Sequence, residues 1–447
     1  MSNARNLANL LGAGTTIATA SIADNAISTA KIAADAVTSA KLDTNIAIAG
    51  TLGTGGVITS GGNIIIPNAG TIGSASDTDA LSIASDGVTT FSQSPVGVPA
   101  GSNNVIINGA MQVAQRSTSV SGLGAATGYF TLDRWEMTEG AASAGRFTMS
   151  QSAVTDLAEH PNALKIDCTT ADTSIAAGEQ LTITQKIEGL NLQQLKATST
   201  STKAFTVSYY AKSDASRAVV LEILMAEGTN KQISALHTIG TSWARYSMTV
   251  PAASSTELDN DATEAMRVNL WLHGGATFTG GTLNTGALAG TTDANRAAGI
   301  GSIFADTDNE IEVTGFQIEP GSSATPFQHR SFSAELALCQ RYYLQAGGSN
   351  YKSVFGAAGW YNTTTSWIGK GGIPVPLRAS PTVSYTGTPR VQNGQAGYNI
   401  SSLSGGLVGD NLTTMHWGAA AATGTLYRAH DMDCNNNAAL VKVDAEL

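Results

Sequence analysis

Apolar residues recur at every fifth position near the start of the chain, between stretches rich in Ala, Ser and Thr. They are Ile17, Ile22, Ile27, Ile32, Val37 and Leu42. A helix repeats its apolar face about every 3.6 residues and a half-buried strand every two, so a period of five fits neither. A fixed repeat in a segment too thin to bury its own core predicts a shaft in which several chains share these six residues as one core. The alternative is a flexible linker.

A short apolar face precedes this repeat, in residues 1–14. Leu7, Leu10 and Leu11 have the i, i+3, i+4 spacing of one helix face, and Gly12 is a typical helix terminator. So short a helix has no core of its own. We therefore expect a peptide that folds when these leucines dock onto a partner, with a disordered segment as the alternative.

The predicted shaft extends beyond the repeat and covers residues 15–100. The segment holds no aromatic residue before Phe91, and pairs of Gly separate β-branched runs such as residues 63–66. This composition predicts short strands wound around a thin axis. A coiled or β-helical winding that closes the strand edges would prevent aggregation.

Strict alternation of apolar and polar residues begins beyond residue 101. It is clearest in five segments: residues 205–209, 221–225, 244–250, 266–272 and 311–318. Polar and Gly-rich turns separate them, without long amphipathic helices. Residues 101–332 are therefore predicted to form an antiparallel β-sandwich. The long irregular stretch 274–301 is expected to be a functional or disordered loop.

The region 333–447 is predicted to open with a short helix over residues 333–345. Ser333 is its expected N-cap, and Leu336, Cys339 and Tyr343 share one face. The remaining residues mix Gly, aromatics and short apolar runs, which indicates a small β-rich domain. The fold class expected for the chain is thus mainly β.

Composition and charge narrow the function classes. Charged residues make up only 13% of the 447 positions, and the formal net charge is −10, so nucleic acid and anionic lipid would meet no basic surface. No apolar run approaches the roughly 18 residues of a membrane span, and residues 1–11 lack the features of a signal peptide. The cysteines are widely spaced and match no metal or redox motif, so we expect buried free thiols: Cys168, Cys339 and Cys434.

Several segments, in order, resemble a domain widespread in the tail fibres of tailed bacteriophages. They are NVIINGAMQVAQR (104–116), LDRW (132–135), FTVSYYAK (205–212), WARYS (243–247), TGFQIEPG (314–321), ATPFQHRSF (324–332), ELALCQRYY (335–343) and DAEL (444–447). The resemblance covers residues 104–447. It implies a jelly-roll domain similar to carbohydrate-binding modules, carried on a trimeric fibre that recognises a bacterial surface. The period-five repeat is similar to the stems of such fibres, and residues 1–14 resemble peptides that attach fibres to the virion tail.

The function expected from the residues and the resemblance is therefore host adsorption by a virion tail fibre without enzymatic activity. The expected partners are two further copies of the chain, tail proteins at residues 1–14 and a bacterial surface polysaccharide. No cofactor is expected. The alternatives are a tailspike that degrades polysaccharide, and a purely structural fibre or connector that binds another virion protein.

Aromatic side chains are the candidate sugar-binding groups, because a pyranose ring presents an apolar C–H face. Trp271 is out of phase with its apolar neighbours, and Trp360, Tyr361 and Trp367 flank a polar turn. Trp417 lies beside a histidine. The predicted glycan-binding residues are thus Trp271, Trp360, Tyr361, Trp367 and Trp417, each with packing or a trimer contact as the alternative. Trp135 and Trp243 are expected in the sandwich core.

An acidic row is the only candidate for glycoside cleavage, which requires two facing carboxylates. Positions two apart on a strand share a face, so Asp306, Asp308, Glu310 and Glu312 would line up. The alternatives are a solvated strand end and a weak Ca²⁺ site at the first three of these residues. The sequence contains no HExxH or GxSxG motif.

Overall fold

The computed structural model describes residues 65–66, 70–74, 77–83, 89–91, 104–140, 143–254, 256–349, 352–408, 411–421 and 424–447. The chain divides into two compact units, Met1–Ser92 and Gln93–Leu447. The predicted docking leucines (Leu7, Leu10, Leu11) and the period-five positions from Ile17 to Leu42 lie outside the described residues. In the first unit, three short antiparallel strands form one sheet: β1 (Gly70–Ser74), β2 (Asp77–Ile83) and β3 (Thr89–Phe91).

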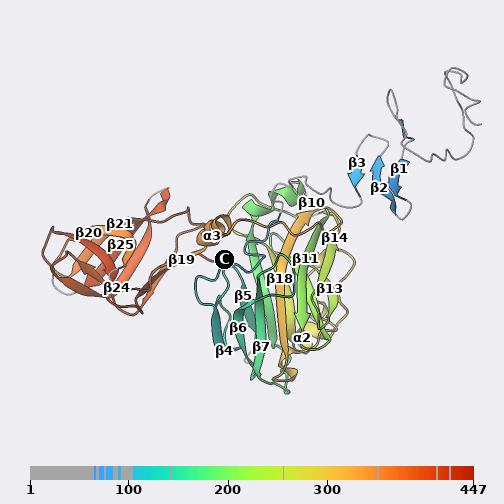
Figure 1. Cartoon of the computed structure of the whole chain (residues 1–447), viewed down its shortest axis with the longest axis horizontal. Coiled ribbons are helices and arrows are strands. Elements are labelled where there is room, and N and C mark those ends of the chain that lie inside the picture. The colour runs from blue at the N-terminus through green and yellow to red at the C-terminus, as the bar shows by residue number, and fades with distance from the viewer. Residues whose placement is uncertain are drawn as a thin grey trace, which may run out of the picture. The chain divides into compact units, whose positions relative to one another are not determined.

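The second unit contains a sandwich of two six-stranded antiparallel sheets (Figure 1). The front sheet has the order β14 (Ala244–Val250), β11 (Phe205–Ser213), β18 (Glu310–Pro320), β7 (Asn162–Thr170), β6 (Arg146–Ala153) and β4 (Ser119–Leu123). The back sheet has the order β17 (Ala289–Gly290), β13 (Lys231–Ile239), β12 (Arg217–Met225), β16 (Glu264–Gly274), β8 (Gln180–Glu188) and β5 (Glu136–Gly140). The antiparallel sandwich predicted from the alternating segments is confirmed.

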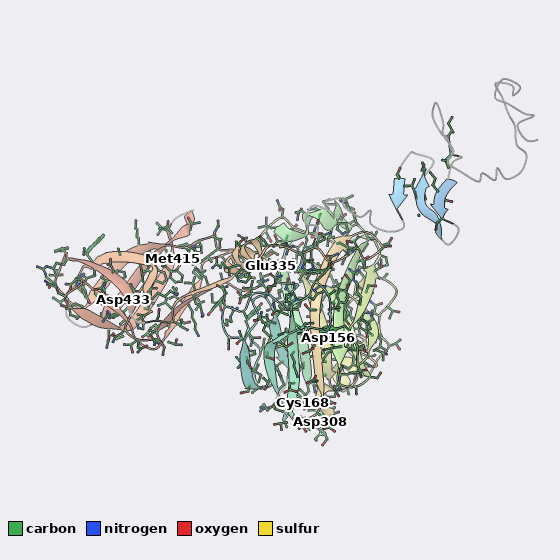
Figure 2. All side chains as sticks on the ribbon, viewed as in Figure 1. Asp156, Cys168, Asp308, Glu335, Met415 and Asp433 are labelled. Carbon is green, nitrogen blue, oxygen red and sulfur yellow. The ribbon has the colours of Figure 1, made fainter. Side chains whose placement is uncertain are left out.

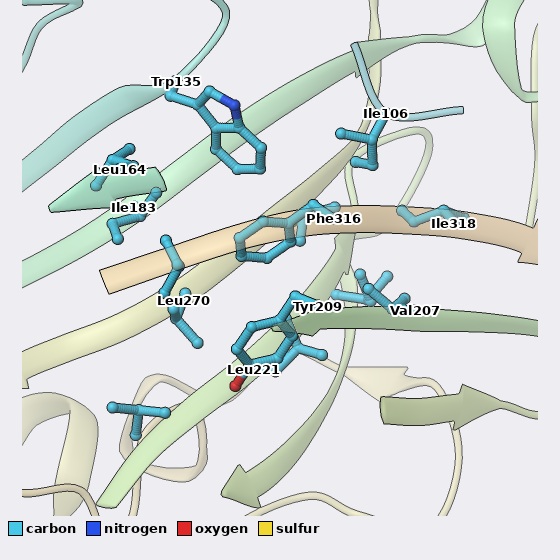
Figure 3. Close-up of a cluster of buried hydrophobic side chains, with 14 of the residues drawn as sticks. Ile106, Trp135, Leu164, Ile183, Val207, Tyr209, Leu221, Leu270, Phe316 and Ile318 are labelled. Atoms are coloured by element: carbon cyan, nitrogen blue, oxygen red, sulfur yellow. The ribbon is translucent and has the colours of Figure 1, made fainter. Parts of the chain in front are cut away.

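The core of the sandwich consists of the apolar residues that alternation directs between the sheets (Figure 3). Phe316 lies near its centre, with its ring 4.7 Å from that of Trp135 and 4.9 Å from that of Tyr209, centroid to centroid. The buried indole of Trp135 donates a hydrogen bond from Nε1 to the carbonyl oxygen of Asn108 at 3.0 Å. Trp135 therefore occupies the core, as predicted.

The predicted helix exists, but its limits differ from the prediction. Helix α3 spans Phe332–Gln340, and its N-cap is Ser331, whose side chain accepts a hydrogen bond from the backbone N–H of Ala334. The Ser333 cap was therefore wrong by two positions. The helix ends before Tyr343 because that residue starts strand β19 (Tyr343–Gly347), which pairs with β27 (Leu440–Asp444). A third strand, β22 (Thr382–Thr386), completes this sheet.

The following residues form a closed six-stranded barrel, which confirms the predicted small β-rich domain. Its strands run in the order β20 (Ser353–Tyr361), β21 (Ser366–Gly372), β25 (Asn411–Ala421), β24 (Gly397–Val408), β23 (Pro389–Gln392) and β26 (Ala429–Cys434). The three cysteines of the chain are buried and free, as expected. None of the helices within the described ranges has the length and apolar character needed to cross a bilayer.

Candidate functional site

The structure places Trp271, a predicted glycan-binding residue, inside the protein. Its side chain has no exposed surface. Residues that follow β16 cover the outer face of this strand, so that the ring of Phe278 lies 5.1 Å from the indole and the guanidinium of Arg296 lies 5.0 Å from it. Nε1 of Trp271 donates to Glu222 at 2.9 Å. Both faces of β16 are therefore buried, and Trp271 presents no ring to a sugar.

Three more of the predicted aromatics lie inside the barrel. Tyr361, Trp367 and Trp417 are fully buried, and Trp417 stacks on Phe355 with the ring centroids 5.6 Å apart. They pack the interior of the barrel and have no exposed surface. Trp360, in contrast, points outward and is 47% exposed.

The predicted acidic row does not form, because strand β18 begins only at Glu310. Asp306 and Asp308 precede it and are exposed, and Asp308 lies at one end of the sandwich (Figure 2). Glu310 forms an ion pair with Lys165, and Glu312 forms one with Lys212 at 3.2 Å. Within the described ranges, no three His, Cys, Asp or Glu side chains are grouped so as to hold a metal ion.

The outer face of the front sheet divides into a covered half and an open half. The residues after β18 fold back over the covered half. There the N–H of Thr325 donates to Glu319 and the N–H of Gln328 donates to Gln317, both at 2.8 Å. Arg245 also donates to the carbonyl oxygen of Thr325. The open half is where the outer face can meet a ligand.

A row of polar side chains crosses the open half. Strand pairing places residues from five adjacent strands directly opposite one another: Lys212, Glu312, Lys165, Ser150 and Ser119. Each Lys of the row is paired with a carboxylate, so the row offers both donors and acceptors without a strong net charge.

Trp243 lies at the β11 end of this row, next to Lys212. The indole of Trp243 is half-buried, and the Lys212 ammonium lies 5.1 Å from its centroid. Nε1 of Trp243 donates to Asp156 at 2.9 Å, and Lys212 donates to the same carboxylate at 3.1 Å. Asp156 thereby fixes both side chains, and it is labelled on the sandwich in Figure 2.

A second aromatic residue, Tyr210, lies on β11 two positions before Lys212. Its ring is 4.9 Å from His160, which also lies 5.0 Å from Phe327 and 5.3 Å from His329. Nδ1 of His160 is buried and has no hydrogen-bond partner among the described residues. Tyr210 and Phe327 are half-buried. We define the front-face site as the polar row together with the side chains of this group: Trp243, Tyr210, Phe327, His329, Asp156 and His160.

A glycine bulge allows His160 to approach the sheet. Gly315 has a φ of +62°, and the pairing register of β11 and β18 shifts beside it. A Cβ atom at this position would lie 2.8 Å from His160 Cε1 and 2.8 Å from Tyr210 Cδ2. β-Bulges commonly redirect side chains beside functional sites. Here the bulge creates the space that the aromatic group occupies.

Charge states in the site follow from these contacts. Hydrogen bonds from Lys212 and Trp243 lower the pKa of Asp156. Burial acts against the charge of Lys212, but hydrogen bonds to Asp156 and Glu312 raise its pKa. Burial, together with His329 and Arg245, lowers the pKa of His160 to about 4. At neutral pH the site therefore contains a charged Lys212–Asp156 pair beside a neutral imidazole.

The sequence prediction missed all three aromatic anchors of the front-face site, Trp243, Tyr210 and Phe327. Trp243 was assigned to the core, which is wrong, since it lies at the surface. The signal was present in the alternation: Trp243 shares its phase with the polar Arg245 and Ser247, and Tyr210 shares its phase with Ser208.

No protein-family model matches the sequence, and no curated protein matches it. Solved structures similar to part of the chain include the enzymatically active domain of tailspike protein 4 of bacteriophage CBA120, at 9% identity and a TM-score of 0.25, with 49% of this chain and 22% of that chain covered. Another is a putative sugar binding protein from Bacteroides thetaiotaomicron, at 14% identity and a TM-score of 0.24, covering 49% and 100%. A third is the family 11 carbohydrate-binding module of a Clostridium thermocellum cellulase, at 9% identity and a TM-score of 0.23, covering 52% and 100%. Such low identities and TM-scores carry no argument about function.

Proposed function

We propose that this chain is a receptor-binding tail fibre of a bacteriophage and that its front-face site binds a bacterial surface glycan. The observation that carries the proposal is the arrangement of two aromatic side chains, Trp243 and Tyr210, beside a paired polar row on an open sheet face. Sugars present both apolar C–H faces and hydroxyl groups, so they require aromatic rings next to a few fixed donors and acceptors. The resemblance to tail-fibre segments supports the same function.

The proposed assembly is a homotrimer on the virion tail. In it, residues 15–100 form a shaft shared by three chains, residues 1–14 dock to tail proteins, and the sandwich has jelly-roll topology. Three copies of one weak site strengthen attachment through avidity. Adsorption occurs without cleavage of glycosidic bonds. Sedimentation equilibrium of the full chain tests this assembly, and a stable monomer would rule it out.

Binding of the full chain to an array of bacterial surface glycans tests the front-face site. We expect Trp243→Ala and Tyr210→Ala to weaken binding at least about tenfold, because a few aromatic anchors carry much of the binding free energy of a site. Leu236→Ala is the matched control, since Leu236 is a 47% exposed side chain of the back sheet. Unchanged binding by both aromatic variants would disprove the site.

A further inference from the structure

The outer surface of the barrel carries a row of four residues that begins at the exposed Trp360. Cross-strand pairing places Trp360 of β20 opposite Ile368 of β21, Ile368 opposite Gly418 of β25, and Gly418 opposite Ser404 of β24. Directly opposite residues of antiparallel strands point to the same face, with their Cβ atoms about 5 Å apart. The four positions therefore form one outward-facing strip that runs from an exposed indole to a hydroxyl group.

A second row of outward-facing residues lies beside this strip, two residues away on each strand. There Ala358 is opposite Lys370, Lys370 is opposite His416, and His416 is opposite Gly406. Lys370 and His416 are exposed. The surface thus combines an apolar strip with donor and acceptor groups along its side.

The surface has a depression at Gly406 and Gly418. A depression of about 380 Å³ is lined by residues from both rows, Ile368, Ser404, Gly406, His416 and Gly418 among them. Its volume lies within the ~300–1,000 Å³ typical of small-molecule sites. The buried indole of Trp417 also lines it and stacks on the half-buried Phe355. The barrel strands that build this floor are labelled in Figure 1.

We propose that this surface is a second carbohydrate site, the Trp360 platform, formed by Trp360, Ile368, Lys370, Ser404, His416 and Gly418. It binds a short run of at least two linked hexopyranose residues, because Trp360 and Ser404 lie three strand spacings, roughly 14 Å, apart. The C–H face of one residue stacks on Trp360 at the rim, beside Ile368 and Lys370, and the hydroxyl groups of the next residue, in the depression, reach Ser404 and His416. The absence of side chains at Gly406 and Gly418 leaves room for this second ring. The platform takes its ligand class from the proposed function but shares no residue with the front-face site, so each chain would hold a glycan at two independent places.

Two variants of the full chain test the platform on the same array of bacterial surface glycans. Trp360→Ala removes the stacking surface. Gly406→Leu fills the depression without disturbing the barrel, because no atom lies within 4 Å of a Cβ built at Gly406. The matched controls are Phe332→Ala, which removes another exposed aromatic ring, and Gly290→Leu, which adds a side chain at another strand glycine with open space around it.

We expect both platform variants to weaken binding to at least one array glycan tenfold or more, and the controls to bind as the parent does. Titration of the parent with methyl hexopyranosides should also protect tryptophan fluorescence from acrylamide quenching, with the protection lost in Trp360→Ala. The proposal is overturned if both platform variants bind every glycan like the parent. If Trp243→Ala loses binding at the same time, the platform is disproved and the front-face site is retained. If binding is lost in the platform variants but not in Trp243→Ala or Tyr210→Ala, the front-face site is disproved and the platform is retained. A parent that binds no glycan overturns both.

Discussion

Arg134 and Glu446 form a buried ion pair, although 312 positions separate them in the chain. Arg134 is only 1% exposed and lies in the turn that leads into β5. Its guanidinium group stacks over the ring of Tyr342 at 3.5 Å and donates to the carbonyl oxygen of Lys186. Glu446 also accepts from Arg116 at 3.2 Å. One carboxylate thus neutralises two arginines from the start of the sandwich.

Replacing this carboxylate should destabilise the protein strongly. In Glu446→Gln the buried Arg134 guanidinium loses its counter-charge, and we expect the free energy of unfolding to fall by about 3–5 kcal/mol. Guanidinium chloride unfolding followed by circular dichroism measures the change. Asp308→Asn alters an exposed carboxylate and should change it by less than about 0.5 kcal/mol. A similar small change in Glu446→Gln would contradict the importance of the pair.

The bulge at Gly315 should be required for both stability and binding. Gly315→Ala forces a side chain into a left-handed backbone conformation and against His160 and Tyr210. Strain of this kind costs about 1–3 kcal/mol, and it displaces the aromatic group of the front-face site. We expect a lower melting temperature and weaker glycan binding. Gly286→Ala, where no atom lies within 4 Å of the added Cβ, should change neither.

His160 should make stability depend on pH between about 4 and 6.5. The unfolded chain takes up a proton at the ordinary histidine pKa of about 6.5, but burial keeps the folded imidazole neutral until about pH 4. The unfolded state therefore binds more protons in this window, and the parent loses stability as the pH falls through it. His160→Phe keeps an aromatic ring but does not titrate.

The measurement for His160 is the difference in unfolding free energy between parent and His160→Phe across pH 4–7. His329 and Glu159, which face the same cluster, are present in both proteins, so the difference isolates the contribution of His160. The variant should become relatively more stable as the pH falls. A difference that stays constant with pH would show that His160 does not carry this dependence.

Arg296 should hold the segment after β16 against the back sheet. Its Nε donates to the fully buried Glu222 at 2.8 Å, so Arg296→Met leaves a buried carboxylate without a cation. We expect a loss of about 3–5 kcal/mol and faster proteolytic cleavage within residues 275–301. Asp293→Asn removes the exposed partner of the same arginine, 3.6 Å away, and should leave the cleavage rate unchanged.

Much of the sandwich was predictable, because period-two alternation is a direct record of which side chains face a core. It located β11, β12, β14, β16 and β18, and β14 has the predicted limits 244–250. The predicted helix was displaced because Ser331 and Ser333 both suit an N-cap, and only the backbone decides which one accepts a hydrogen bond from an N–H of the first turn.

The site residues were less predictable for a physical reason. Alternation tells which side of a strand a residue faces, but not whether a distant segment covers that side. Trp271 is out of phase with the sandwich core and is still buried, since residues after β16 cover it. Trp367 and Trp417 face the interior of a barrel whose closure depends on pairing between strands far apart in the sequence. Only Trp360 of the predicted aromatics reached the surface.

The closure of the barrel affects how closely copies of this chain can be packed without pairing their strands. An open sheet offers unpaired N–H and C=O groups at its edge strands, to which a neighbouring copy can add its own strand. In the barrel each of the six strands pairs on both sides, from β20 round to β26 and back. Copies held close together at high local concentration would therefore meet through side chains alone, which favours separate domains over strand-by-strand fusion.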